Sequence, residues 1–128
     1  MRTPPYKAVI FDFDGVILES ADIKTAGLVE AFSDYPQHGE AIRAYDRAHM
    51  GLSRHAKVEG IYREVLGIPR AEAERTSRAE AFTRFTLDRV LSCPFVPGAL
   101  EVLQSLDSRC MAFIASGTPH EELEVVVG

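Results

Sequence analysis

The sequence contains no tryptophan, only two cysteines and no apolar run long enough to cross a bilayer. Cys93 and Cys110 are too few for a disulfide framework or a four-ligand zinc site, so we interpret both as packing residues. A membrane-spanning helix needs about 20 apolar residues, and residues 1–7 lack the apolar centre of a signal peptide. We therefore expect a cytoplasmic protein without structural disulfides.

Basic residues are outnumbered by acidic ones, since 14 Lys and Arg stand against 19 Asp and Glu and leave a net charge of −5. Nucleic acids and anionic membranes are usually bound by clusters of Lys and Arg, so we expect neither as a partner. The apolar fraction of 46% and the charged fraction of 26% are typical of a folded globular chain.

Two short apolar runs, at residues 7–11 and 110–115, are rich in β-branched and aromatic residues. We interpret them as strands of a parallel sheet that is buried on both faces. The first run ends at Asp12-Phe-Asp-Gly15 and the second at Ser116-Gly-Thr-Pro119. Because ligands of open α/β sheets bind at the carboxyl ends of the strands, these two ends are the predicted functional region.

Between the two strands the spacing of apolar residues is helical, over residues 21–32, 40–50, 53–66 and 69–91, and a fifth helix is predicted over 98–106. The stretch of residues 19–93 is far too long for a loop, and its four amphipathic helices can bury a core together. We predict an α/β core formed by residues 1–18 and 94–128, with residues 19–93 inserted as a helical domain.

Asp12 and Asp14 stand two residues apart where the first strand ends, and Gly15 allows a sharp turn. Residues at this spacing in an extended segment point to the same side. Two carboxylates this close repel unless a divalent cation shares them or one holds a proton. With Mg²⁺ present, one could attack phosphorus and the other could transfer protons. The alternative is an acidic turn without a ligand.

The second strand is followed by Ser116, Gly117 and Thr118, and Thr118 with Glu121 has the form of a capping box at the start of a helix. The amides of a helix start, a serine hydroxyl and a glycine are suited to an anion such as phosphate, although a capped turn without a ligand is the alternative. If the strands are neighbours, both motifs meet in one crevice and form the outline of a phosphoryl-transfer site.

These motifs resemble those of the haloacid dehalogenase superfamily. Val9-Ile-Phe-Asp-Phe-Asp-Gly-Val16 resembles its first motif and Phe113-Ile-Ala-Ser-Gly-Thr118 its second. Phe95-Val-Pro-Gly98 and the leucines that follow it are similar to the segment before the second motif in the phosphoglycolate phosphatase and β-phosphoglucomutase branch. The resemblance spans the whole chain and implies a Rossmann-like parallel-sheet core with an inserted helical-bundle cap domain.

The resemblance also implies roles for individual residues. Asp12 would be the nucleophile that forms an aspartyl-phosphate, and Asp14 the general acid and base. The Asp12 carboxylate and the Asp14 backbone carbonyl would hold Mg²⁺, while Ser116, Gly117 and Thr118 would bind phosphate. The substrate would be a small phosphorylated metabolite, because an alkoxide leaving group needs the proton of a second aspartate and a departing halide does not.

Within the predicted cap, Gly51-Leu-Ser-Arg54 resembles the segment in which sugar-phosphate mutases carry a substrate-facing arginine. Arg54 is therefore a candidate substrate residue, although a solvated charge is the alternative. We interpret Glu19 and Ser20, at the entry to the cap, as helix-capping residues, although the resemblance also allows substrate contacts or a hinge at these positions.

Two motifs of the superfamily, a lysine and a second acidic pair, are not found after the second motif. We therefore expect a truncated chain that is incomplete for catalysis and shows little or no hydrolysis by itself. A missing C-terminal segment or self-association would complete the sheet. The alternatives are a phosphomutase, and a catalytically inactive short form that keeps a phosphate or metal half-site or has a structural and interaction role.

Overall fold

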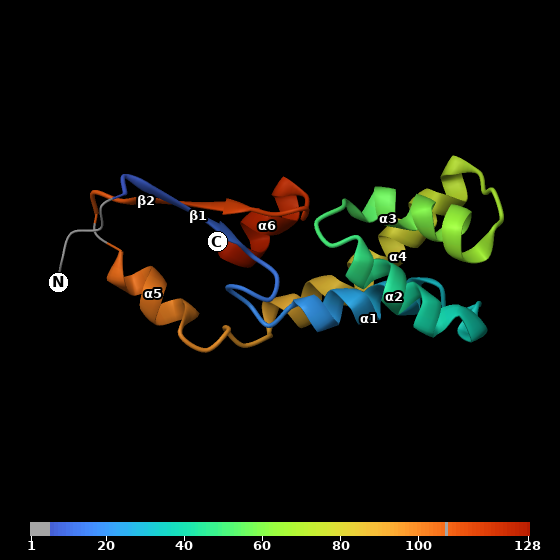
Figure 1. Cartoon of the computed structure of the whole chain (residues 1–128), viewed down its shortest axis with the longest axis horizontal. Helices are drawn as coiled ribbons and strands as arrows, with labels where there is room; N and C mark the ends of the chain where they lie inside the picture. The colour runs from blue at the N-terminus through green and yellow to red at the C-terminus, as the bar shows by residue number, and fades with distance from the viewer. Residues whose placement is uncertain (1–5, 107) are drawn as a thin grey trace.

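Two parallel strands lie side by side at one end of the molecule (Figure 1). The computed structural model describes residues 6–106 and 108–128, so residues 1–5 of the predicted core lie outside the described residues. Strand β1 (Ala8–Asp12) pairs with β2 (Met111–Ala115) in a register that sets Asp12 opposite Ala115. The two predicted strands are thus confirmed, and as neighbours.

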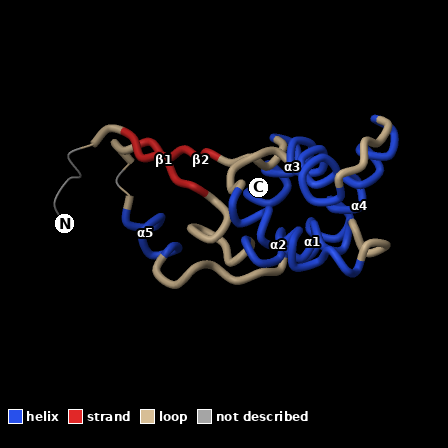
Figure 2. Tube along the Cα trace, turned by 45° about the vertical axis from the view of Figure 1, so that its right-hand side comes forward, coloured by secondary structure: helices blue, strands red, loops and turns tan. Residues whose placement is uncertain are grey.

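Helices make up most of the rest of the described chain, and both strands point toward the group that α1 to α4 form (Figures 1 and 2). The α-helices are α1 (Ala21–Ala31), α2 (Gly39–Ala48), α3 (Arg54–Gly60), α4 (Glu72–Leu91), α5 (Ala99–Ser105) and α6 (His120–Val127). Two short helices of other types are the 3-10 helix η1 (Pro36–His38) and the π-helix η2 (Ile61–Leu66). The predicted α/β fold class is confirmed.

The third predicted helix is divided, because α3 continues into the wider turns of η2, a π-helix. It ends at Gly67, whose φ of 67° is a left-handed conformation that glycine adopts at low cost. The helical periodicity of residues 53–66 therefore gave the right extent, but it does not distinguish the two helix types.

The prediction that both strands are buried on both faces is wrong for the described residues. Ile10 is 70% exposed, and Met111 and Phe113 are 59% and 49% exposed. Phe11 and Ile114, on the other face, pack against a cluster of buried side chains that includes Phe13. A pair of strands flanked by helices on one face leaves the opposite side chains in solvent, whatever their hydrophobicity.

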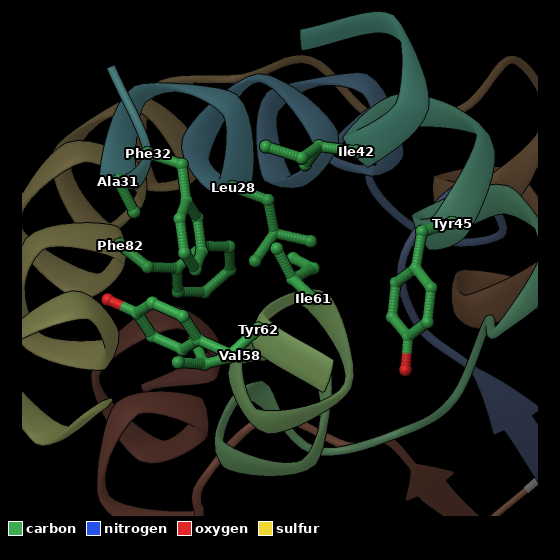
Figure 3. Packing of buried hydrophobic residues seen from close by; sticks show 9 residues of the cluster. All are labelled: Leu28, Ala31, Phe32, Ile42, Tyr45, Val58, Ile61, Tyr62 and Phe82. Atoms are coloured by element: carbon green, nitrogen blue, oxygen red, sulfur yellow. The ribbon is translucent and has the colours of Figure 1, made fainter. Parts of the chain in front are cut away.

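The larger apolar core lies among the helices (Figure 3). Its buried members come from α1 and the residue that follows it, and from α2, α3, η2 and α4. They are Leu28, Ala31, Phe32, Ile42, Tyr45, Val58, Ile61, Tyr62 and Phe82. Residues 19–93, which we call the helical segment, therefore have an apolar core of their own, as the apolar stripes of the sequence predicted. No helix in residues 6–106 or 108–128 is both long enough and apolar enough to cross a membrane.

One ion pair at the edge of this core makes stability depend on pH. Arg78 donates hydrogen bonds to Asp34 Oδ1 at 2.5 Å and Oδ2 at 2.7 Å. The bonds from the guanidinium lower the pKa of Asp34 below its ordinary value of 3.8. An acid with a lowered folded-state pKa stabilises the protein above its unfolded-state pKa, and this stability is lost as the pH falls through the folded-state pKa.

We expect Asp34→Asn to lower the free energy of unfolding near pH 7 by less than about 1 kcal/mol, because ion pairs with exposed carboxylates are weak. The difference from the unsubstituted protein should shrink as the pH falls below 3.8. Urea unfolding from pH 7 to pH 2.5 measures this, with the exposed Asp88→Asn as control. A difference that persists unchanged at pH 2.5 would contradict the assignment.

Candidate functional site

The carboxyl ends of the two strands bring the predicted motifs together. Asp12 is the last residue of β1, and Ser116 directly follows its partner strand. Phe13 stands between the two aspartates in the sequence, and because it is only 3% exposed, it anchors this turn in the core. Asp12 and Asp14 both line one cavity, in agreement with the alternation of an extended segment.

Both oxygens of the Asp14 carboxylate have hydrogen-bond donors. Ser20 Oγ donates to Asp14 Oδ1 at 2.6 Å, and Lys24 Nζ donates to Asp14 Oδ2 at 2.7 Å. The Asp12 carboxylate accepts one bond, from the backbone N–H of Phe13 at 2.7 Å, through Oδ1. The two aspartates therefore differ: both oxygens of Asp14 accept hydrogen bonds, whereas Oδ2 of Asp12, a residue that lines the cavity, accepts none from the described residues.

Ser116, Gly117 and Thr118 form a compact turn, which we call the phosphate cradle after the role that the sequence predicts for it. The Thr118 backbone N–H donates to Ser116 Oγ at 3.1 Å, and Ser116 Oγ lies 3.1 Å from Thr118 Oγ1. A Cβ added to Gly117 would lie 3.1 Å from the backbone oxygen of Gly51, so glycine allows the loop of Gly51 and Leu52 to approach the cradle closely.

The cavity between the strand ends and the helices has a volume of about 210 Å³. Its charged and hydroxyl-bearing lining residues are Asp12, Asp14, Lys24, Asp46, Arg54, Lys57, Ser116 and Thr118. Three acidic and three basic side chains thus share one small space, where charges interact more strongly than in bulk water. The hydrogen-bond partners of the three cations determine which of them has a donor left for a ligand.

Arg54 lines the cavity as predicted, but its guanidinium is paired with a carboxylate. It donates to Glu122 Oε1 at 2.5 Å and Oε2 at 2.6 Å, and also to Thr83. The side chain is only 7% exposed, and its guanidinium stacks over the ring of Phe82. A bidentate pair of this kind is strong and directional, so Arg54 joins α3 to α6 in this structure.

Lys57 is likewise paired within the helical segment. Its Nζ lies 2.5 Å from Asp46 Oδ1, and Asp46 Oδ2 accepts a hydrogen bond from Thr25 at 2.6 Å. Asp46 is 2% exposed, and removal of its counter-ion would leave a buried charge uncompensated. The pair therefore links α1, α2 and α3 as a structural feature.

Two local predictions at the site are wrong. Helix α6 begins at His120 with Pro119 as its N-cap, and no side chain caps it, because the Thr118 hydroxyl instead contacts Lys24 and Ser116. Ser20 precedes α1 without capping it, since its hydroxyl bonds to Asp14. In both cases a hydroxyl expected to satisfy a helix end is used within the site.

Sequence reasoning missed Lys24, whose Nζ donates to Asp14 Oδ2 at 2.7 Å and to Thr118 Oγ1 at 2.6 Å. A signal was present, because Lys24 lies four residues before Leu28 and seven before Ala31, both buried. It therefore occupies the apolar stripe of its helix. A lysine at such a position must find an acidic or hydroxyl partner, and none is available on that face of α1 itself.

The acidic residues fit Mg²⁺ as part of a ligand set. Mg²⁺ commonly uses one or two carboxylates and completes its shell with water and substrate phosphate oxygens. Asp12 has the oxygen chemistry required, and one of its carboxylate oxygens accepts no bond from the described residues. Among the described residues, no group of three or more His, Cys, Asp or Glu gathers to bind a metal, so the rest of a shell would come from other ligands.

The described chain has an α/β arrangement of two parallel strands and six α-helices, which matches about half of a solved hydrolase structure. One solved structure that it resembles is a hydrolase from Pseudomonas syringae, with a TM-score of 0.76 and 21% sequence identity. The match covers 95% of this chain and 55% of that one, so the chain spans about half the length of that hydrolase. No family model and no curated protein matches the sequence.

Proposed function

We propose that the chain carries the nucleophile half of a magnesium-dependent phosphatase that hydrolyses a small phosphate ester through an aspartyl-phosphate. The observation that supports it most is the convergence of Asp12 and Asp14 with the phosphate cradle in one cavity at the ends of two paired parallel strands. The hydrolase-like fold and the resemblance of both motifs to the haloacid dehalogenase superfamily are in keeping with this proposal.

Asp12 is proposed as the nucleophile because it lines the cavity and its Oδ2 accepts no hydrogen bond within the described chain. Attack on phosphorus forms the aspartyl-phosphate and breaks the bond to the leaving oxygen. Asp14 would give that oxygen a proton and later take one from the water that hydrolyses the intermediate. Ser20 and Lys24 keep the Asp14 carboxyl in position for both transfers.

The phosphate cradle would bind the phosphoryl oxygens through backbone N–H groups and the Ser116 hydroxyl. When bound, Mg²⁺ would neutralise charge around the phosphoryl group, with the Asp12 carboxylate and the Asp14 backbone carbonyl as its protein ligands. The loop of Gly51 and Leu52 closes the cavity above Gly117, so it is the part of the helical segment best placed to select the leaving group.

The assay that tests this proposal follows hydrolysis of p-nitrophenyl phosphate and phosphoglycolate with and without Mg²⁺, in the protein expressed from its whole reading frame. We expect Asp14→Asn to lower kcat by at least about 100-fold, because the amide cannot transfer the proton. The exposed Asp22→Asn serves as control and should keep the original rate. An Asp14→Asn variant with an unchanged rate would contradict the proposed role.

The assay also separates the alternatives. Transfer of the phosphoryl group to a second hydroxyl of a sugar phosphate, rather than to water, would identify a phosphomutase. Binding of inorganic phosphate without any turnover would instead favour a non-catalytic half-site.

A further inference from the structure

We propose that Lys24, on helix α1, binds the phosphoryl group directly and positions Asp14 against the phosphate cradle, an inference that rests on the proposed function. Lys24 belongs to the helical segment, whereas Asp14 and Thr118 belong to the strand ends. Its ammonium is the point at which the two motifs and the helices meet.

The contacts of Lys24 place its charge between the two halves of the site. Nζ lies 2.7 Å from Asp14 Oδ2 and 2.6 Å from Thr118 Oγ1. Through Thr118 the ammonium is joined to Ser116, and through Asp14 it is joined to Ser20. A continuous chain of hydrogen bonds therefore connects the proposed acid and base with the proposed phosphate ligands.

An ammonium group has three protons to donate, and the described residues accept two of those of Lys24. The side chain is 20% exposed and lines the cavity, so the remaining donor is available to a ligand bound there. A phosphoryl oxygen there would accept a charge-assisted hydrogen bond, which is among the stronger kinds in proteins.

The other two cations of the cavity are less suited to this task. Arg54 is held by Glu122 and Lys57 by Asp46, and neither carboxylate takes part in the proposed chemistry. Lys24 Nζ, in contrast, bonds within the described chain to Asp14 and Thr118, which both line the proposed site. It also lies beside the aspartate pair, whose charge would otherwise repel an incoming phosphate dianion.

The first test measures binding of inorganic phosphate by calorimetry, in the presence of Mg²⁺, to the protein expressed from its whole reading frame. We expect Lys24→Met to weaken binding at least about tenfold, as loss of one charged hydrogen bond implies. Lys24→Arg, which keeps the charge, should recover most of the affinity. Lys7→Met removes an exposed ammonium beyond the opposite end of β1 and should bind as the unsubstituted protein does.

The outcomes separate this inference from the function on which it rests. Phosphate binding that is equally tight in Lys24→Met overturns the role of Lys24 and leaves the proposed function standing. Failure of the unsubstituted protein to bind phosphate overturns the proposed function itself.

A second measurement needs no variant and so does not depend on the folding of Lys24→Met. Reductive methylation with formaldehyde modifies lysine amines, and mass spectrometry follows each site. Saturating inorganic phosphate should slow modification of Lys24 several-fold and leave that of Lys7 unchanged. Equal rates at Lys24 with and without bound phosphate would overturn the direct contact.

Discussion

Replacement of Asp12 by asparagine is expected to abolish formation of the phosphoenzyme and to lower kcat by at least about 1,000-fold, as removal of a nucleophile does in enzymes with covalent intermediates. The amide has almost the same shape as the carboxylate, and the N–H of Phe13 can still donate to its oxygen. Folding should therefore be nearly unaffected, and the loss should be chemical.

The measurement is the rate of Mg²⁺-dependent hydrolysis, together with detection of the aspartyl-phosphate by mass spectrometry after acid quenching. Asp22→Asn, an exposed acid in the first turn of α1, is the matched control. An Asp12→Asn protein that still accumulates a phosphorylated peptide containing residue 12 would show that another side chain is the nucleophile.

The second large effect is expected on stability. Phe32 is 1% exposed, and its ring meets that of Tyr62 edge-on at 5.2 Å, while the guanidinium of Arg78 lies 5.0 Å from its centre. We expect Phe32→Ala to lower the free energy of unfolding by about 3–5 kcal/mol, because the lost burial is accompanied by a cavity that the helices fill only in part.

Urea unfolding followed by circular dichroism measures this change. Leu91→Ala, at the exposed end of α4, removes apolar atoms from a side chain that is 48% exposed and should cost far less. If both variants lose the same stability, the core of the helical segment is not organised around Phe32 as the structure indicates.

Much of the fold could be predicted from sequence because its elements carry strong local signals. The strands at 7–11 and 110–115 follow from short runs of β-branched and aromatic residues, and the helices between them follow from apolar residues with a period of 3.6. Likewise, Asp12 and Asp14 could be placed on one side of an extended segment. Their position beside Ser116 required only that two parallel strands be neighbours, which the register of β1 and β2 confirms.

The predictions that failed concern side chains whose hydrogen bonds or burial depend on residues far away in the sequence. Thr118 has the local form of a helix cap, yet Lys24, 94 residues away in sequence, takes its hydroxyl. Ser20 stands in the position of a cap and instead bonds to Asp14. Ile10 looks like a buried strand residue, but nothing in the described chain covers its face of the sheet. A hydroxyl group can bond to any of several partners, and an apolar side chain is buried only where another element covers it. Local sequence does not show which of these arrangements the fold adopts.

The sequence by itself determined the order of the elements, the helical character of residues 19–93 and the placement of acidic and hydroxyl residues at two strand ends. These properties follow from backbone periodicity and side-chain chemistry, which act over a few residues. Only the tertiary structure decided that Arg54 is paired with Glu122 and that Lys24 joins Asp14 to Thr118. A charge in a partly buried cavity is satisfied by whichever opposite charge the fold brings within reach, and that distance is set by packing between helices and strands far apart in the chain.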